Sequence, residues 1–96
     1  RQEGRTVLLC EDNEGSVTGH ERWGALLSSP DGIGDWQPCR PVVAYDHDIR
    51  WADGTTFHAT RRERPWLLME EGRPVCLFTS VWDGTRAWNQ PVMVGW

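Results

Sequence analysis

Residues 61–81 have the sequence RRERPWLLMEEGRPVCLFTSV, which contains the longest apolar runs and the densest charge cluster of the chain. Pro65 fixes its own φ and favours an extended Arg64, so a helix through this point is disfavoured. The nearly continuous apolar run at residues 66–69 is then typical of a strand that is buried on both faces. The stretch therefore predicts a β-strand that begins with charged residues.

A turn and a second strand follow directly. Residues 70–73 (EEGR) predict a turn in which Gly72 takes positive φ. Pro74 can open the returning strand at a position where no ladder donor is needed. Val75–Val81 is rich in β-branched and aromatic residues, which favour a strand. Together the two runs predict a β-hairpin with a polar open end.

Short apolar or β-branched runs separated by turn residues recur through the rest of the chain, and no window of 11 or more residues has a helical period. Pro38 and Pro41 bracket a predicted loop. The sequence therefore predicts an all-β protein of antiparallel sheets. The further expected strands are residues 6–10, 24–29, 42–45, 55–60 and 91–96.

One pattern occurs twice, 52 positions apart: Asp-Gly-x-x-x-Trp at residues 31–36 and again at 83–88. Each copy follows a strand end and is followed by Gln-Pro and a valine-containing strand. A period near 50 residues with several short strands per repeat is typical of propeller blades. The chain is therefore interpreted as one β domain, residues 1–96, with two propeller-like blades at about 5–45 and 46–96.

Composition restricts the partners. The net charge of −4 and the absence of a basic block argue against nucleic acid, and no apolar run approaches the roughly 20 residues of a membrane-spanning helix. Three widely spaced cysteines without a C-x-x-C pair indicate free thiols in a reducing compartment, hence a cytoplasmic location, and no metal site or cofactor is expected. Seven tryptophans favour broad sheet packing or aromatic ligand platforms.

Residues 24–32 followed by Trp36 resemble the "strand, Ser-x-Asp-Gly, Trp" element of five-bladed β-propeller glycoside hydrolases, the group of families 43, 32 and 117. Residues 11–19, 49–54 and 63–74 continue the resemblance in the same order, so that it covers roughly Val7–Val94. It implies about two of the five blades and a carbohydrate as substrate or ligand.

The resemblance also implies site residues. Glu63 in Glu63-Arg64-Pro65 resembles the general acid, which needs a raised pKa that Arg62 and Arg64 would oppose within about 4–6 Å. The alternative is a structural Glu63 that is ion-paired to an arginine. Asp12 resembles the auxiliary acidic residue of these enzymes, and its alternative is a turn acid that caps its own backbone.

Five further residues are candidates for substrate binding: Arg62, Arg64, Trp51, Trp66 and His58. Trp82 and Trp88 are additional candidates for stacking on sugar rings, and residues 46–48 (DHD) form a polar loop with oxygen ligands for a cation. Surface or packing roles are the alternative for His58.

The resemblance implies that the catalytic base or nucleophile lies in an early blade, and no residue of this sequence can be matched to it. Three hypotheses follow. The chain is a glycoside-hydrolase-like domain completed by assembly, as a homo-oligomer or with other blades; a non-catalytic carbohydrate-binding module; or an oligomeric structural module without enzymatic activity.

Overall fold

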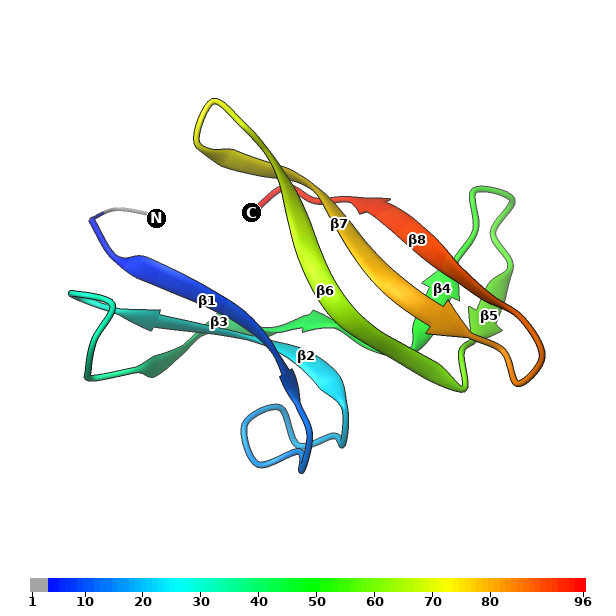
Figure 1. Ribbon diagram of the computed structural model, residues 1–96, viewed down its shortest axis with the longest axis horizontal. Coiled ribbons are helices and arrows are strands. Elements are labelled where there is room, and N and C mark those ends of the chain that lie inside the picture. Colours follow the sequence, from blue (N-terminus) through cyan, green and yellow to red (C-terminus); the bar gives the residue numbers. More distant parts are fainter. Residues whose placement is uncertain (1–3) are drawn as a thin grey trace. The chain divides into compact units, whose positions relative to one another are not determined.

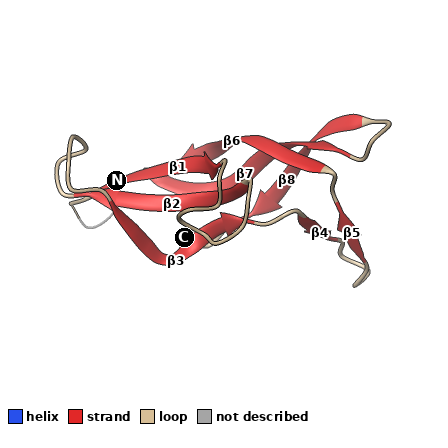
Figure 2. Cartoon of the chain, turned by 90° about the horizontal axis from the view of Figure 1, so that it is seen from below, coloured by secondary structure: helices blue, strands red, loops and turns tan. Residues whose placement is uncertain are grey.

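The computed structural model describes residues 4–96, which form eight strands and no helix (Figure 2). All strand pairs are antiparallel, so the predicted all-β class with antiparallel sheets is confirmed. None of the described residues belongs to a helix that could cross a membrane. The chain divides into two compact units, one up to Tyr45 and one over Asp46–Trp96.

The first unit is a three-stranded sheet with the strand order β1 (Thr6–Asp12), β2 (Trp23–Ser29) and β3 (Gln37–Tyr45) (Figure 1). β1 pairs with β2 over its whole length. The strands predicted at residues 6–10 and 24–29 are therefore present. The buried apolar side chains of this unit are Ala25, Leu26 and Tyr45.

Gly24 is packed against an aromatic ring. It lies opposite Tyr45 in the register of β2 and β3, and a Cβ at Gly24 would lie 2.2 Å from two carbons of the Tyr45 ring. A side chain at this position would therefore displace the ring. The close approach explains why a glycine interrupts an otherwise apolar strand.

The loop predicted between Pro38 and Pro41 is wrong, because both prolines lie within β3. Leu27 of β2 is opposite Pro38, whereas Ala25 is opposite Val43, so the pairing is irregular between these points. β3 is also an outer strand that pairs only with β2 among the described strands. Proline is tolerated there because an irregular outer strand needs fewer backbone donors.

The second unit contains a hairpin of β4 (Asp48–Arg50) and β5 (Thr56–His58), and a sheet with the order β6 (Arg61–Glu70), β7 (Arg73–Trp82), β8 (Ala87–Met93). A small core joins the hairpin to the sheet. Its buried members are Ile49, Ala59 and Val81, and Phe57 and Trp88 pack against them. The strands predicted at 55–60 and 91–96 are present with different ends, as β5 and β8.

The predicted hairpin at residues 61–81 is present, with strands longer than expected. Glu70 is opposite Arg73, so the loop has two residues, and Glu71 and Gly72 both have positive φ (51° and 78°). Two successive left-handed residues form the type I′ turn that matches the twist of a two-stranded ribbon. The turn is therefore set by local sequence, as predicted.

The repeated Asp-Gly pattern marks the same turn in both sheets. Asp31 Oδ1 accepts hydrogen bonds from the backbone N–H of Ile33 and Gly34 (2.8 and 3.1 Å). Asp83 Oδ1 accepts them from Thr85 and Arg86 (2.8 and 2.7 Å). Each turn joins the second and third strands of its sheet. The repeat thus corresponds to one local structure that is formed twice.

Candidate functional site

One face of the β6–β7–β8 sheet carries several of the candidate residues. We call it the platform face; it presents Arg61, Glu63, Trp66 and Leu68 of β6 opposite Trp82, Ser80, Phe78 and Cys76 of β7. β8 continues the same rows with Ala87, Asn89, Pro91 and Met93. Trp66 (51% exposed), Leu68 (48%) and Met93 (77%) are open to solvent. The prediction that residues 66–69 are buried on both faces is therefore wrong.

A β-bulge at Arg64 and Pro65 creates this arrangement. Glu63 is opposite Ser80 and Trp66 is opposite Phe78, so β6 has one more residue than β7 between these pairs. Arg64 has φ of +54° and is not extended as predicted, because the bulge requires a left-handed residue there. Regular alternation would place Glu63 and Trp66 on opposite faces, and the extra residue brings them to the same one.

The centre of the platform face is an aromatic stack. The rings of Trp66 and Phe78 are nearly parallel, with centroids 4.2 Å apart and an interplanar angle of 7°. One face of the indole is thus covered by Phe78, and half of the Trp66 side chain remains exposed. The result is a rigid, flat apolar surface whose orientation is fixed by its neighbour.

Glu63 is half-buried and lies in one row with Ser80 and Asn89. Within residues 4–96 its carboxylate has no ion pair, and neither Arg62 nor Arg64 lies within salt-bridge distance. The alternative of a structural Glu63–arginine pair is therefore not observed in the described part of the chain. This carboxylate can accept hydrogen bonds from a ligand.

Arg62 belongs to the opposite face of the sheet and is buried (5% exposed). Its Nε donates to Thr79 Oγ1 (3.0 Å), and its Nη1 donates to the backbone carbonyls of Asp46 and Asp48 (3.2 and 3.3 Å). These contacts hold the start of β4 against β7. The structure thus places Arg62 among structural contacts, and Arg64 is exposed at the bulge.

Asp12 lies in the first unit and organises the loop between β1 and β2. Its buried carboxylate accepts hydrogen bonds through Oδ2 from Thr18 N (2.7 Å), Thr18 Oγ1 (2.8 Å) and Val17 N (3.1 Å). The backbone N–H of Thr18 is the main cause that lowers the pKa of Asp12. Its oxygen contacts are those of a capping residue, the alternative that the sequence left open.

His58 and Trp51 lie on the β4–β5 hairpin. His58 Nδ1 is 2.7 Å from Asp48 Oδ1, and its side chain is 76% exposed. Trp51 is 41% exposed beside the turn at Gly54. The carboxylate of Asp46 is bound by Arg50 (2.9 Å). Residues 4–96 contain no group of three or more His, Cys, Asp or Glu side chains that could hold a metal ion.

Four residues of the platform face have no functional signal of their own in the sequence: Arg61, Phe78, Ser80 and Asn89. They join Glu63 and Trp66 only through the register of β6, β7 and β8. For Arg61 the turn at residues 70–73 contains a usable signal. A two-residue loop puts Glu70 opposite Arg73, and counting back along both strands from this pair places Arg61 opposite Trp82.

Comparison of the sequence with protein-family models and curated proteins, and of the structure with solved structures, gives no significant match.

Proposed function

We propose that this chain is a carbohydrate-binding β domain of the propeller-like, glycoside-hydrolase-related type, and that the sugar binds on the platform face. One observation carries the proposal: the half-exposed Trp66, held flat by Phe78, shares a face with the half-buried carboxylate of Glu63. The two three-stranded sheets with their matching Asp-Gly turns support the propeller-like interpretation.

Sugar rings have an apolar C–H surface and a rim of hydroxyl groups. The exposed indole of Trp66 offers the flat apolar contact. Because Phe78 already fixes its orientation, the indole loses little conformational entropy when a ligand binds. In the neighbouring row, Glu63 can accept hydrogen bonds from a ligand, and the Ser80 hydroxyl and the Asn89 amide can both donate and accept them. This combination of one apolar surface and a few convergent polar groups is typical of a ligand site.

Hydrolysis is the second candidate function. Glycosidases need two carboxyl groups about 5–10 Å apart. Among the strand residues paired across the platform face, Glu63 is the one carboxylate. A second one would come from another copy of the chain or from other blades. Glu63 has no ion pair within the described residues, so its carboxyl group is available to a substrate.

Assembly is part of the same proposal. In the second unit, β6 and β8 each pair only with β7 among the described strands, so each has an outer edge. Such edges are templates for strands of another chain. Homo-oligomerisation or pairing with further blades would cover them and would supply the missing carboxylate.

Isothermal titration calorimetry with a panel of neutral oligosaccharides tests binding. Trp66→Ala should raise Kd at least about tenfold, or roughly 1.4 kcal/mol, for any glycan that binds. Trp51→Ala is the matched control, since it removes an exposed indole from the hairpin and should leave Kd unchanged. An equal loss in both variants would contradict the platform face as the site.

Hydrolysis has a separate test. Release of the chromophore from aryl glycosides should depend on Glu63 and should be abolished in Glu63→Gln, with sugar binding largely retained. Rates that are equal in the two proteins, or at background in both, would remove the enzymatic candidate and leave the binding function.

A further inference from the structure

We infer that the ligand of the platform face is an acidic oligosaccharide: one sugar ring stacks on Trp66, and an anionic group further along the same glycan binds Arg61. The inference rests on the proposed carbohydrate-binding function and specifies its ligand class. Arg61 lies at the end of the platform face that is farthest from the turn at residues 70–73.

The guanidinium of Arg61 is oriented by an aromatic side chain. Arg61 is opposite Trp82, and its Cζ lies 5.6 Å from the centroid of the Trp82 ring. Both side chains are exposed. A guanidinium above an indole face keeps its in-plane N–H donors available, so the contact orients the group without using its hydrogen bonds.

Arg61 has no carboxylate partner within the described residues. By contrast, Arg50 is bound to Asp46 (2.9 Å), and Arg62 donates to two backbone carbonyls and a hydroxyl. The charge of Arg61 therefore remains available on the same face as the Trp66 stack. A planar, forked donor of this kind matches a carboxylate, and it also matches a sulfate ester.

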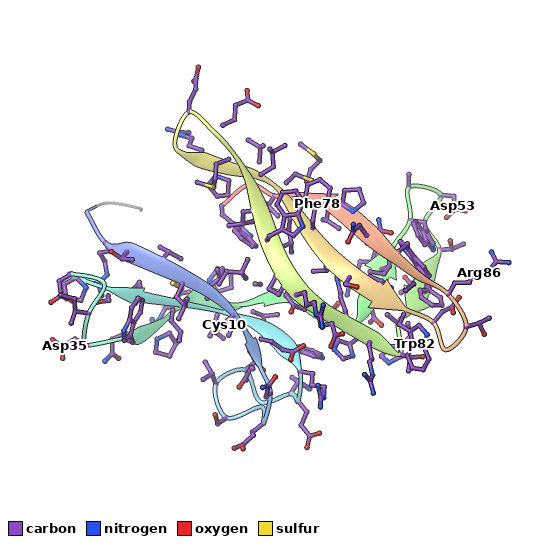
Figure 3. The ribbon with its side chains drawn as sticks, viewed as in Figure 1. Cys10, Asp35, Asp53, Phe78, Trp82 and Arg86 are labelled. Atoms are coloured by element: carbon purple, nitrogen blue, oxygen red, sulfur yellow. The ribbon has the colours of Figure 1, made fainter. Side chains whose placement is uncertain are left out.

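The spacing requires a ligand of several sugar units. Phe78, which lies beneath Trp66, and Trp82, which lies beneath Arg61, are four residues apart on β7, or about 13 Å along an extended strand. Figure 3 shows the two labelled side chains well apart along β7. Glu63 lies between the two positions, and its negative charge disfavours an anionic group there. The anionic group is therefore assigned to the Arg61 end.

A glycan array with matched pairs tests the inference: each uronic-acid oligosaccharide beside its neutral methyl ester, and each sulfated oligosaccharide beside its unsulfated form. The wild-type protein should bind the acidic member of a pair about tenfold more tightly. Arg61→Gln should abolish that preference, so that the acidic and the neutral member of a pair bind with similar affinity. Whether uronates or sulfated sugars show the preference identifies the anion.

Arg73→Gln is the control, because it removes the same charge from an exposed position at the other end of the same hairpin and should leave the preference intact. A preference that is absent, or that survives Arg61→Gln, overturns the acidic-ligand inference, while loss of binding in Trp66→Ala still supports the proposed function. If no glycan binds at all, the proposed function fails together with the inference.

Discussion

Glu63 and Trp66 lie on the same face of the β6–β7–β8 sheet although they are three positions apart, because a bulge at Arg64 and Pro65 adds one residue between them. A regular strand would place their side chains on opposite faces. The candidate sugar site thus depends on a local irregularity of the backbone rather than on the periodicity of the sequence.

The left-handed backbone conformation of Arg64 at the bulge can be tested by substitution. A β-branched residue is strongly disfavoured at its φ of +54°, whereas glycine is not. We expect Arg64→Val to be less stable than Arg64→Gly by about 1–2 kcal/mol in urea unfolding. Arg73 lies in β7 without positive φ, so the order of the Val and Gly variants should reverse there. The same order at both positions would contradict the bulge.

Much of the fold could be predicted from the sequence. The turn at residues 70–73 and the Asp-Gly turns at 31 and 83 have local causes, namely left-handed residues and aspartate side chains that bind their own backbone. Such signals identify most strand boundaries within a few residues. The loop expected around Pro38 and Pro41 is wrong, because the extended backbone there is set by pairing with β2 and not by the local preference of the prolines.

The site was less predictable, since its residues meet only across strands. A second irregularity lies between Leu68 and Met69 and shifts the register of β6 and β7 back by one residue. Arg61 therefore lies opposite Trp82, the pairing that the turn would give without any irregularity. Between the two irregularities, Trp66 is shifted by one residue and stacks on Phe78. Neither shift has a simple signal in the sequence, apart from Pro65, which cannot donate to the ladder.

Gly24 gives a prediction for the first unit. A Cβ at this position would overlap the Tyr45 ring, so Gly24→Ala should destabilise the protein by about 1–3 kcal/mol in thermal or urea unfolding. Gly34 has open space around its Cβ position, and Gly34→Ala is the control, with an effect within about 0.5 kcal/mol. Equal effects of the two substitutions would show that Tyr45 does not pack on Gly24.

Arg62 is predicted to stabilise the folded protein. Arg62→Met keeps much of the side-chain volume but leaves Thr79 and two backbone carbonyls without this donor, which costs about 1–3 kcal/mol for each group that stays buried. Arg50→Met removes an exposed arginine and should cost less than about 1 kcal/mol. The difference is measured by urea unfolding. A neutral Arg62→Met would contradict the structural role of this residue.

Asp12 should contribute to the loss of folding stability at acidic pH. Its pKa is lowered in the folded state, mainly by the backbone N–H of Thr18, so its stabilising contribution is complete above the ordinary value of about 3.9 and is lost as the pH falls through the folded-state pKa. The urea concentration at the midpoint of unfolding should therefore decrease as the pH is lowered from about 5 to about 2. In Asp12→Asn this decrease should be smaller. An unchanged pH profile in the variant would disprove this contribution.

Part of the pH dependence should remain in Asp12→Asn. The pKa values of Asp31, Asp53 and Asp83 are also lowered, in each case chiefly by hydrogen bonds from neighbouring turn residues. Combining Asp12→Asn with Asp31→Asn should flatten the profile further than either substitution alone.

Sugar binding on the platform face is tested most directly by ¹H–¹⁵N spectra of the seven tryptophan indoles, assigned with single Trp→Phe variants, during titration with an oligosaccharide that binds. If the sugar binds on the platform face, the Trp66 and Trp82 signals shift along one saturating curve while those of Trp36 and Trp51 stay in place. Shifts confined to Trp36 or Trp51, with Trp66 unchanged, would contradict binding on the platform face.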